Sequence, residues 1–550
     1  MEFEEVPRLS MDIRDSSIIK ISRNHIHKIK TNMLTKTFAS AVQGVSAQTI
    51  TVEVNAGGVP PQGKQFLFMV GLPDSAVREG FQRIGAAIKN IGIKFPHLKI
   101  VVNLAPADIR KQGSAYDLPI ALGMLSSTGK VLPDQLHEYV IMGELALDGQ
   151  LRPITGALPI AMQAKKENFR GVILPKQNAR EAAIVSDLEV YGIENLREAV
   201  DFFNGAAPLE RIEIDIEQYF REKQSVYDID FSDVKGQENI KRALELAAAG
   251  GHNVILIGPT GAGKSMLARR LPTILPPLSL NEAMDTTKIH SVAGILPMNT
   301  ALVAARPYRS PHHTISDVAL VGGGSDPSPG EISLAHNGVL FLDELPEFKR
   351  TVLEVLRQPM EERRVTISRA RVTVDYPASF MLVASMNPCP CGYYNHPDKE
   401  CVCGPGMVQR YLNKISGPLL DRIDLHVEVT PVSYEELSSV KKSKVSSADI
   451  AARVIKAREI QAERFKDYET IYSNAQMPSR LVRQVCQLSP EGLTLLKTAM
   501  ERLQLSARAY DRILKVARTG ADLAGSASIE IEHLSEAIQY RSLDREGWAG

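Results

Sequence analysis

Eight consecutive residues decide the fold of this chain: Gly258-Pro259-Thr260-Gly261-Ala262-Gly263-Lys264-Ser265. The mostly apolar run 253–257 before them predicts a buried strand, and the stretch 266–271 after them favours a helix. A glycine-rich turn between a strand and a helix surrounds phosphate groups with backbone N–H groups and a helix N-terminus. We expect Lys264 to reach the β- and γ-phosphates of a nucleoside triphosphate and the Ser265 hydroxyl to bind Mg²⁺. The alternative, a chance glycine-rich turn, is disfavoured by the flanking strand and helix.

Two further apolar runs end in polar residues that suit phosphate chemistry. The run 338–342 predicts a strand, and Asp343 and Glu344 follow it directly. Asp343 would hold Mg²⁺ through its ligand shell, and Glu344 would polarise the attacking water. The run 380–386 ends in Asn387, whose amide could orient that water and detect the γ-phosphate. A solvated Asp-Glu pair is the plainer interpretation, but the series of strand ends predicts hydrolysis.

Two arginines further along the chain could stabilise the charge that develops in phosphoryl transfer. Arg422 lies in the segment 417–425, from which it could enter the site of a neighbouring subunit. Such an arginine finger is worth ~10³-fold or more in rate. Arg508 lies in the first turn of a predicted helix capped by Ser506. For each arginine alone, an ion pair within the chain is the more common explanation.

These residues, in this order, resemble an AAA+ ATPase of the magnesium-chelatase-like superfamily, and more narrowly the competence-protein ComM (YifB) family. The resemblance covers nearly the whole chain from about Met33 onward. It implies ATP as the nucleotide, Asn387 as sensor 1, Arg422 as the trans-acting finger and Arg508 as the sensor 2 arginine. The segment 230–237 resembles the one that such ATPases lay over the adenine. The most specific segments are 307–313, 330–338 and 410–418.

Two insertions in the ATPase region are candidates for contact with DNA. The first contains the glycine-rich stretch 321–325 beside His312 and His313, which predicts a mobile pore loop or a plain surface linker. The second, 364–374, alternates on both sides of a central turn and predicts a β-hairpin tipped by Arg369 and Arg371. Related helicases carry a hairpin at this place, facing the ring axis. Basic tips there could follow phosphates regardless of sequence, whereas the alternative is a solvated hairpin end.

Cysteine usage predicts a metal site next to the nucleotide. Four of the five cysteines fall within 15 residues, at Cys389, Cys391, Cys401 and Cys403. Clustered thiolates in a reducing compartment suit a tetrahedral, structural Zn²⁺ better than disulfides, although the one-residue spacing is tighter than the usual Cys-x-x-Cys. His396 is a spare candidate ligand, and Cys486 is most simply a core residue.

The N-terminal half predicts a separate α+β domain. Its expected strands are 49–54, 65–70 and 99–104, and its expected helices are 75–91 and 117–125. This region resembles the Lon-protease C-terminal fold (ribosomal S5 domain 2-like), which works through a Ser–Lys dyad. Ala115 and Pro159 stand where that dyad would be, with Ser114 one residue away. Because proline cannot act as the base, we expect a scaffold that is not an active peptidase.

The predicted fold class is an α/β AAA+ P-loop NTPase core with a C-terminal helical lid, preceded by the α+β Lon-protease-like domain. A chain of 550 residues is long enough for two to four domains. The expected boundaries are an extension at 1–32, disordered or preceding a native start at Met33, then 33–208 (Lon-protease-like), 209–229 (linker), 230–430 (ATPase core) and 431–550 (lid).

Composition limits the partners of the chain. Lys+Arg and Asp+Glu each total 64, which excludes a globally basic coat for nucleic acid but allows a local basic surface. There is no apolar run of 18 residues and no signal-peptide pattern, so we expect a cytoplasmic protein with no membrane partner.

The finger and lid arginines together imply a homo-hexameric ring. The resemblance then implies an ATP-dependent motor acting on single-stranded or branched DNA, as a helicase or branch-migration enzyme during recombination or natural transformation. The alternative is a protein-remodelling ATPase of the magnesium-chelatase type. Such motors work with a partner that carries an Asp-x-Ser-x-Ser metal site, and that motif does not occur in this chain.

Overall fold

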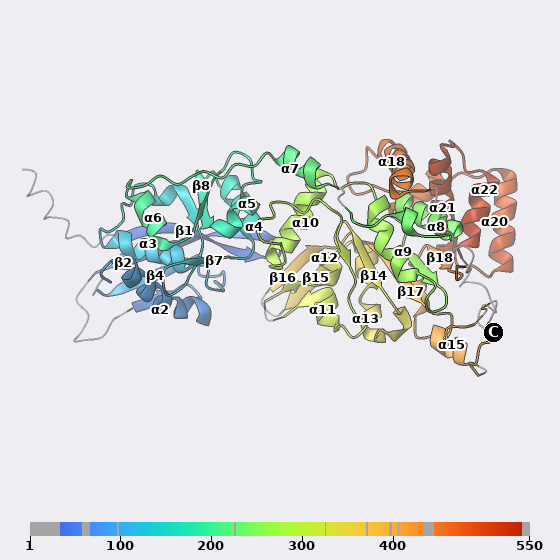
Figure 1. Cartoon of the computed structure of the whole chain (residues 1–550), viewed down its shortest axis with the longest axis horizontal. Helices are drawn as coiled ribbons and strands as arrows, with labels where there is room; N and C mark the ends of the chain where they lie inside the picture. Colours follow the sequence, from blue (N-terminus) through green and yellow to red (C-terminus); the bar gives the residue numbers. More distant parts are fainter. Residues whose placement is uncertain are drawn as a thin grey trace, which may run out of the picture. The chain divides into compact units, whose positions relative to one another are not determined.

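The computed structural model describes residues 34–57, 67–95, 98–224, 227–324, 326–369, 372–394, 396, 399–404, 406–432 and 445–541. The expected extension 1–32 and Arg371 lie outside these residues. The described chain divides into two compact units (Figure 1). The first comprises 34–41, 49–152 and 193–210, and the second comprises 42–48, 153–192 and 211–541.

The first unit is an α+β structure. Its strands lie in the order β3-β4-β2-β1-β5. Burial alternates along β2, with Ile50, Val52 and Val54 facing the core, whereas α3 is buried along its whole length. The three predicted strands and two predicted helices of this region are confirmed where they are described, as β2 (Ser46–Ala56), β3 (Leu67–Val70), β4 (Ile100–Ala105), α2 (Ser75–Asn90) and α3 (Asp117–Ser127). The sequence analysis did not predict the other elements, which are β1 (Leu34–Gln43), β5 (Tyr139–Ile141), β6 (Glu144–Leu145), β7 (Leu151–Arg152) and α6 (Leu196–Phe203).

The second unit is built around a five-stranded parallel sheet in the order β11-β14-β17-β10-β18. Its strands are β10 (Val254–Ile257), β11 (Tyr308–Arg309), β14 (Val339–Leu342), β17 (Met381–Met386) and β18 (Leu425–Glu428). Every residue of β10, β14 and β17 is buried, as expected for parallel strands covered on both faces. Because the strands are parallel, all of them begin at one edge of the sheet, the amino edge, and end at the other, the carboxyl edge.

Helices of the C-terminal part pack against α8 (Glu238–Gly250), as Figure 1 shows for α18 (Ser447–Arg464) and α21 (Ala507–Ala524). We call residues 445–541 the lid. The predicted helix from Ala507 is confirmed, with Ile513, Leu514 and Ala517 buried and Gly525 as its left-handed C-cap. The lid and the sheet share one hydrophobic cluster. The other lid helices are α19 (Ser479–Val485), α20 (Pro490–Arg502) and α22 (Ile531–Gln539).

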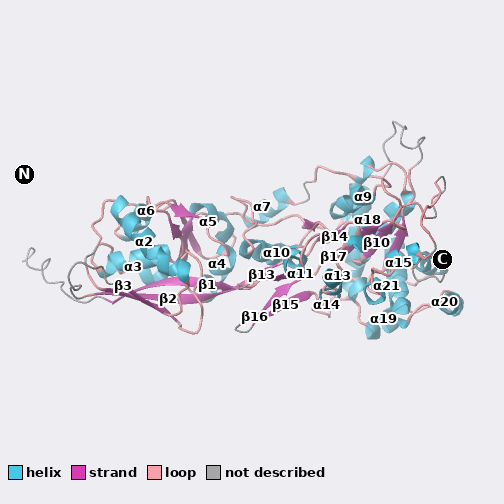
Figure 2. Ribbon diagram, turned by 90° about the horizontal axis from the view of Figure 1, so that it is seen from below, coloured by secondary structure: helices cyan, strands magenta, loops and turns pink. Residues whose placement is uncertain are grey.

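The predicted hairpin is confirmed as β15 (Arg364–Arg369) and β16 (Val372–Pro377), two antiparallel strands visible in Figure 2. A helix that the sequence analysis did not predict, α7 (Ile216–Lys223), lies within the expected linker 209–229. No helix in the described part of the chain is both long and apolar enough to cross a bilayer. The remaining elements of the second unit are α4 (Ala157–Lys166), β8 (Gly171–Pro175), α5 (Lys176–Ala182), β9 (Glu189–Ile193), α9 (Lys264–Arg270), α10 (Leu280–Val292), α11 (Asp317–Val321), β12 (Gly322–Gly323), β13 (Ser328–Pro329), α12 (Glu331–Leu334), α13 (Arg350–Glu354), α14 (Arg357–Glu362), α15 (Met407–Leu412) and α16 (Gly417–Leu420).

Candidate active site

The glycine-rich loop 258–263 joins the carboxyl end of β10 to the first turn of α9. A Cβ atom on Gly258 would lie 2.2 Å from the Val429 carbonyl oxygen, so no larger residue fits there. Gly263 caps α9 with φ at +86°, a backbone conformation that favours glycine. The strand, loop and helix expected from the sequence are therefore present, with the helix N-terminus at the carboxyl edge.

Lys264 points back into this loop. Its side chain is buried, and its Nζ donates to the carbonyl oxygens of Gly258 (2.7 Å) and Pro259 (2.9 Å) and to Asn387 Oδ1 (3.1 Å). Burial lowers the pKa of Lys264, and the negative charges of Asp343 and Glu344 oppose this shift. A bound triphosphate would supply the compensating charge that the desolvated ammonium group needs.

Three side chains form an oxygen cluster beside the loop. Ser265 Oγ donates to Asp343 Oδ2 at 2.7 Å, and Ser385 Oγ donates to Asp343 Oδ1. A hydroxyl and a carboxylate are the oxygen ligands that Mg²⁺ prefers, so Ser265 and Asp343 fit this ion. The sequence analysis missed Ser385, whose signal was a polar residue inside the otherwise apolar run of β17.

Glu344 follows Asp343 at the carboxyl edge and has its backbone in the left-handed region, with φ at 55°. Its carboxylate is more than half exposed, and Oε2 lies 3.5 Å from His313 Nδ1. The His313 ring packs against His312, with ring centres 4.1 Å apart, and edge-on against Phe348. The sequence analysis placed His313 only beside the glycine-rich stretch, because its approach to Glu344 depends on the tertiary structure.

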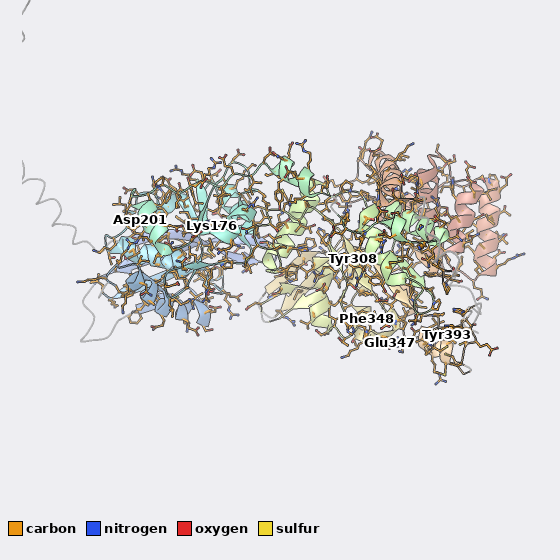
Figure 3. The ribbon with its side chains drawn as sticks, viewed as in Figure 1. Lys176, Asp201, Tyr308, Glu347, Phe348 and Tyr393 are labelled. Atoms are coloured by element: carbon orange, nitrogen blue, oxygen red, sulfur yellow. The ribbon has the colours of Figure 1, made fainter. Side chains whose placement is uncertain are left out.

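A cavity of about 450 Å³ opens beside Glu344 and Asn387. Lys414 in its wall pairs with Glu347 at 3.3 Å, and Arg410 is an exposed cation of the same wall. Figure 3 labels Glu347, which lines this cavity, and Phe348, which packs against His313. The cavity is lined by Glu344, Glu347, Asn387, Pro390, Met407, Arg410, Tyr411 and Lys414.

The four clustered cysteines come together, with all their Sγ atoms within 4.8 Å of one another. Cys389 Sγ lies 3.3 Å from Cys391 Sγ and 3.7 Å from Cys401 Sγ. A tetrahedral zinc ion with Zn–S bonds of ~2.3 Å requires sulfur separations of roughly 3.8 Å, so the geometry fits such an ion. Cys403 completes the set, and the four thiols could hold a metal ion.

The cysteine loop lies beside the phosphate loop, as expected. A Cβ atom on Gly392 would lie 3.6 Å from Thr260 Oγ1. His396 does not belong to the cluster, and its ring packs edge-on against Tyr393, labelled in Figure 3, at 5.7 Å. Cys486 is buried apart from the cluster, which confirms it as a core residue.

Arg422 lies at the amino edge, just before β18 begins. Its side chain is only 8% exposed, with Nη2 2.6 Å from Glu361 Oε1 and Nη1 donating to the Pro418 carbonyl oxygen. Its Nε has no hydrogen-bond partner among the residues that the structure describes. Arg422 therefore does not join Lys264, Glu344 and Asn387 within this chain.

Arg508 is also at the amino edge. Ser506 caps α21 as predicted, accepting from the backbone N–H of Ala509. The Arg508 side chain is mostly exposed, and its Nη1 lies 3.6 Å from Asp421 Oδ2. The first turn of α21 thus faces the segment before β18. Of the five predicted catalytic residues, the structure brings Lys264, Glu344 and Asn387 together at the carboxyl edge. Both arginines lie at the amino edge.

The two loops predicted to contact DNA lie side by side. Gly322 and Gly323 form the short strand β12, which pairs with β13. A Cβ atom on Gly323 would lie 3.0 Å from Arg369 Nη2, at the described end of the hairpin. Arg369 is exposed. A glycine-rich backbone and a basic side chain therefore share one surface of the second unit.

Known proteins resemble this chain over nearly its whole length. The chain is 42% identical over 508 residues to the competence protein ComM of Haemophilus influenzae, covering 92% of this chain and 97% of that protein. It is 44% identical over 505 residues to the protein YifB of Escherichia coli, covering 92% and 96%. The chain belongs to the ComM/YifB family.

Three family descriptions match successive parts of this ComM/YifB chain. They are "Subunit ChlI of Mg-chelatase" at 50–178, "Magnesium chelatase, subunit ChlI" at 230–437 and "Magnesium chelatase, subunit ChlI C-terminal" at 444–541. A more distant relative is the magnesium-chelatase 38 kDa subunit of Rhodobacter capsulatus, 27% identical over 29% of this chain and 50% of that protein. The ComM/YifB chain is thus a magnesium-chelatase-like AAA+ protein, a family that suggests ATPase activity with ATP and Mg²⁺.

Proposed function

We propose that this protein is a ring-forming ATPase that moves along single-stranded or branched DNA, as a helicase or branch-migration motor in recombination or natural transformation. The observation that carries the proposal is the division of catalytic residues between the two edges of the sheet. Lys264, Glu344 and Asn387 lie at the carboxyl edge, and Arg422 lies at the amino edge. A β-strand rises ~3.3 Å per residue, so the four-residue strand β10 alone separates the two edges by roughly 13 Å.

This separation supports assembly into a ring. An arginine at the amino edge cannot serve the site of its own chain, but it can serve the carboxyl edge of a neighbour packed head to tail. Repeating that contact closes a ring, most simply a homo-hexamer. In each site Ser265 and Asp343 would hold Mg²⁺ on ATP, Glu344 would activate water, and the neighbour's Arg422 and Arg508 would neutralise developing charge.

The contact between the glycine-rich loop and the hairpin supports DNA as the substrate. Gly323 and Arg369 place a glycine backbone beside a cation, which together suit a phosphate backbone of any sequence. The segment between His313 and Gly322 also links this surface to Glu344, because His313 faces the Glu344 carboxylate. DNA bound at this surface would therefore act close to the residue that activates water.

The cysteine cluster is proposed to hold a structural Zn²⁺. Its four sulfur ligands leave no open position for a substrate, which is typical of structural zinc sites. The ion would fix the loop that packs on Thr260 of the phosphate loop. Such thiols stay reduced in the cytoplasm, where we place the protein.

The N-terminal region is proposed to be a Lon-protease-like scaffold rather than a peptidase. The methyl side chain of Ala115 cannot act as a nucleophile. Pro159, which is buried in α4, has no basic side chain. The second candidate function is a protein-remodelling ATPase of the magnesium-chelatase type. It is favoured by the likeness to the magnesium-chelatase 38 kDa subunit, and it would need a protein partner.

The deciding experiment is the steady-state ATPase rate with no DNA and with single-stranded, duplex or four-way-junction DNA. We expect DNA to raise the rate, and the double variant Arg369→Ala/Arg371→Ala to lose that stimulation. The matched control is Arg364→Ala, which removes an exposed arginine from the other end of the same hairpin. A rate that ignores every DNA, with no binding at low salt, would favour the protein-remodelling function instead.

A further inference from the structure

Arg422 is surrounded by residues that the lid holds in place. The residue two positions later, Asp424, is fully buried, and its Oδ1 accepts from Arg512 Nη1 of α21 at 2.8 Å. Its Oδ2 accepts from the backbone N–H of Asn253 at 3.0 Å. The Asn253 side chain donates to the Arg422 carbonyl oxygen at 3.1 Å. Asp424 therefore joins the lid, the start of β10 and the finger segment at one point.

A second lid arginine holds the residue between Arg422 and Asp424. Arg541 is 1% exposed, and its Nη1 donates to the Ile423 carbonyl oxygen at 2.6 Å. The neighbouring Tyr540 carbonyl oxygen accepts from the backbone N–H of His426 at 2.8 Å. The last described turn of the lid thus runs along the start of β18.

The third contact is on the other side of Arg422. Arg508 and Arg512 are one helical turn apart on α21, so they lie on the same face of the helix. Arg508 approaches Asp421, and Arg512 binds Asp424. The two aspartates flank Arg422, and each is paired with an arginine of the same lid helix.

The Arg422 side chain itself has no contact with the lid among these bonds, since its partners are Glu361 and the Pro418 carbonyl oxygen. Glu361, its ion-pair partner, is about half exposed, and the Arg422 Nε has no partner among the described residues. A cavity of about 440 Å³ opens beside Arg422 and Glu361. The lid therefore fixes the backbone of the finger segment, while the guanidinium has room to leave Glu361.

We infer that Arg512 and Arg541 are positioning residues, which set the backbone of residues 421–424 so that Arg422 can reach the nucleotide of the neighbouring subunit. This inference rests on the proposed trans role of Arg422. Buried ion pairs often contribute little net stability compared with apolar residues, so the bond between Arg512 and Asp424 is better explained by geometry than by stability. Arginine also fixes direction, because its planar fork binds a carboxylate in a defined orientation.

The test uses mixed rings. We expect Arg512→Lys to lower kcat at least tenfold while KM for ATP stays within twofold, because only the finger that a subunit lends is displaced. Adding Lys264→Ala subunits, which cannot bind nucleotide but keep an intact Arg422, should restore turnover at the Arg512→Lys sites. Adding Arg422→Ala subunits should not restore turnover, because neither kind of subunit then supplies a correctly positioned Arg422. Arg541→Lys should behave as Arg512→Lys does.

The matched control is Arg453→Ala, which removes an ion pair between α18 of the lid and Glu245 of α8, with no contact to residues 421–424. It should lower the unfolding temperature without lowering kcat. The inference is overturned if Arg453→Ala loses kcat as Arg512→Lys does, or if Lys264→Ala subunits restore Arg422→Ala but not Arg512→Lys. If they fail to restore even Arg422→Ala, the trans role is wrong, and the inference falls with it.

Discussion

The two edges of the five-stranded sheet assemble their functional residues in different ways. At the carboxyl edge, Asp343 and Asn387 each follow the end of a strand directly, and Lys264 follows β10 after the six-residue phosphate loop. Parallel pairing brings those strand ends together. At the amino edge, Asp424 meets Arg512, which is 88 residues away in the chain, and Ile423 meets Arg541, which is 118 residues away. The carboxyl edge is built by local sequence, and the amino edge is built by packing of the lid.

Under the proposed function, the two edges have distinct parts in one reaction. The carboxyl edge has groups that bind phosphate and metal, and it is open at the cavity beside Glu344. The amino edge has arginines and a buried aspartate, and no phosphate-binding loop occurs at that edge within the described residues. On this proposal each edge is incomplete for catalysis, and the largest effects should come from substitutions at the carboxyl edge.

The largest effects are expected from two substitutions at the carboxyl edge, which separate ATP binding from ATP hydrolysis. Lys264→Ala should abolish detectable ATP binding, because the ammonium group is the buried cation of the phosphate loop. Glu344→Gln should leave binding within about threefold and lower kcat by roughly 10²-fold or more, since the amide cannot accept the proton of the attacking water. Fluorescent-nucleotide titration and steady-state hydrolysis measure the two quantities. Normal hydrolysis by Glu344→Gln would contradict its assigned role.

The next effect tests whether the amino edge acts on another subunit. Arg422→Ala should lower kcat by about 10³-fold while leaving ATP affinity nearly unchanged. Mixing these subunits with Lys264→Ala subunits should recover activity, because each kind supplies what the other lacks. Hydrolysis is measured across a series of mixing ratios. A strictly linear loss of activity with no recovery would place the action of Arg422 within its own chain.

Removal of the metal ion proposed for the cysteine cluster should have an effect of intermediate size, on the stability of the fold. Cys401→Ser, or prolonged chelation of the protein, should release about one zinc ion per chain and destabilise the fold by more than about 3 kcal/mol. Elemental analysis and thermal unfolding report the two changes. Cys486→Ser is the matched control, since this buried cysteine lies outside the cluster and should leave the zinc content unchanged. Chelation that alters neither quantity would exclude a structural metal.

The smallest effect concerns acid sensitivity near the amino edge. His336 is buried, and its Nδ1 accepts from the backbone N–H of Ser379 just before β17. Burial lowers the pKa of His336 to about 4. Between pH 6.5 and 4 the unfolded chain binds the extra proton and the folded chain does not, so stability falls on acidification through this range.

The resulting loss in the free energy of unfolding is roughly 3 kcal/mol at pH 4 and about 2 kcal/mol at pH 5. His336→Asn keeps an acceptor near the Nδ1 position and cannot be protonated. Urea unfolding gives the free energy of unfolding at pH 7 and at pH 5. The difference between these two free energies should be smaller by about 2 kcal/mol in the variant. An unchanged difference would mean that other groups cause the acid sensitivity.

Sequence patterns were sufficient to predict features that depend on a few neighbouring residues. The hairpin around Arg369, the helix from Ala507 with its Ser506 cap, and the cysteine cluster beside the phosphate loop were all predicted and are present. Ser385 and His313 were not predicted as partners of the acidic pair, because each contact joins separate strands or loops. A polar residue within a buried strand was the only signal available for Ser385.

By itself, the sequence determined the phosphate loop, the acidic strand end, the cluster of four thiols and the membership of a magnesium-chelatase-like family. The first three each depend on a short stretch of sequence, where backbone geometry leaves little choice, and the family membership depends on their order along the chain. Only the tertiary structure decided that Arg422 and Arg508 stand at the amino edge, beside Asp421 and Glu361. That placement depends on how the lid packs against the sheet, which is a sum of many weak and distant contacts that no short stretch of sequence encodes.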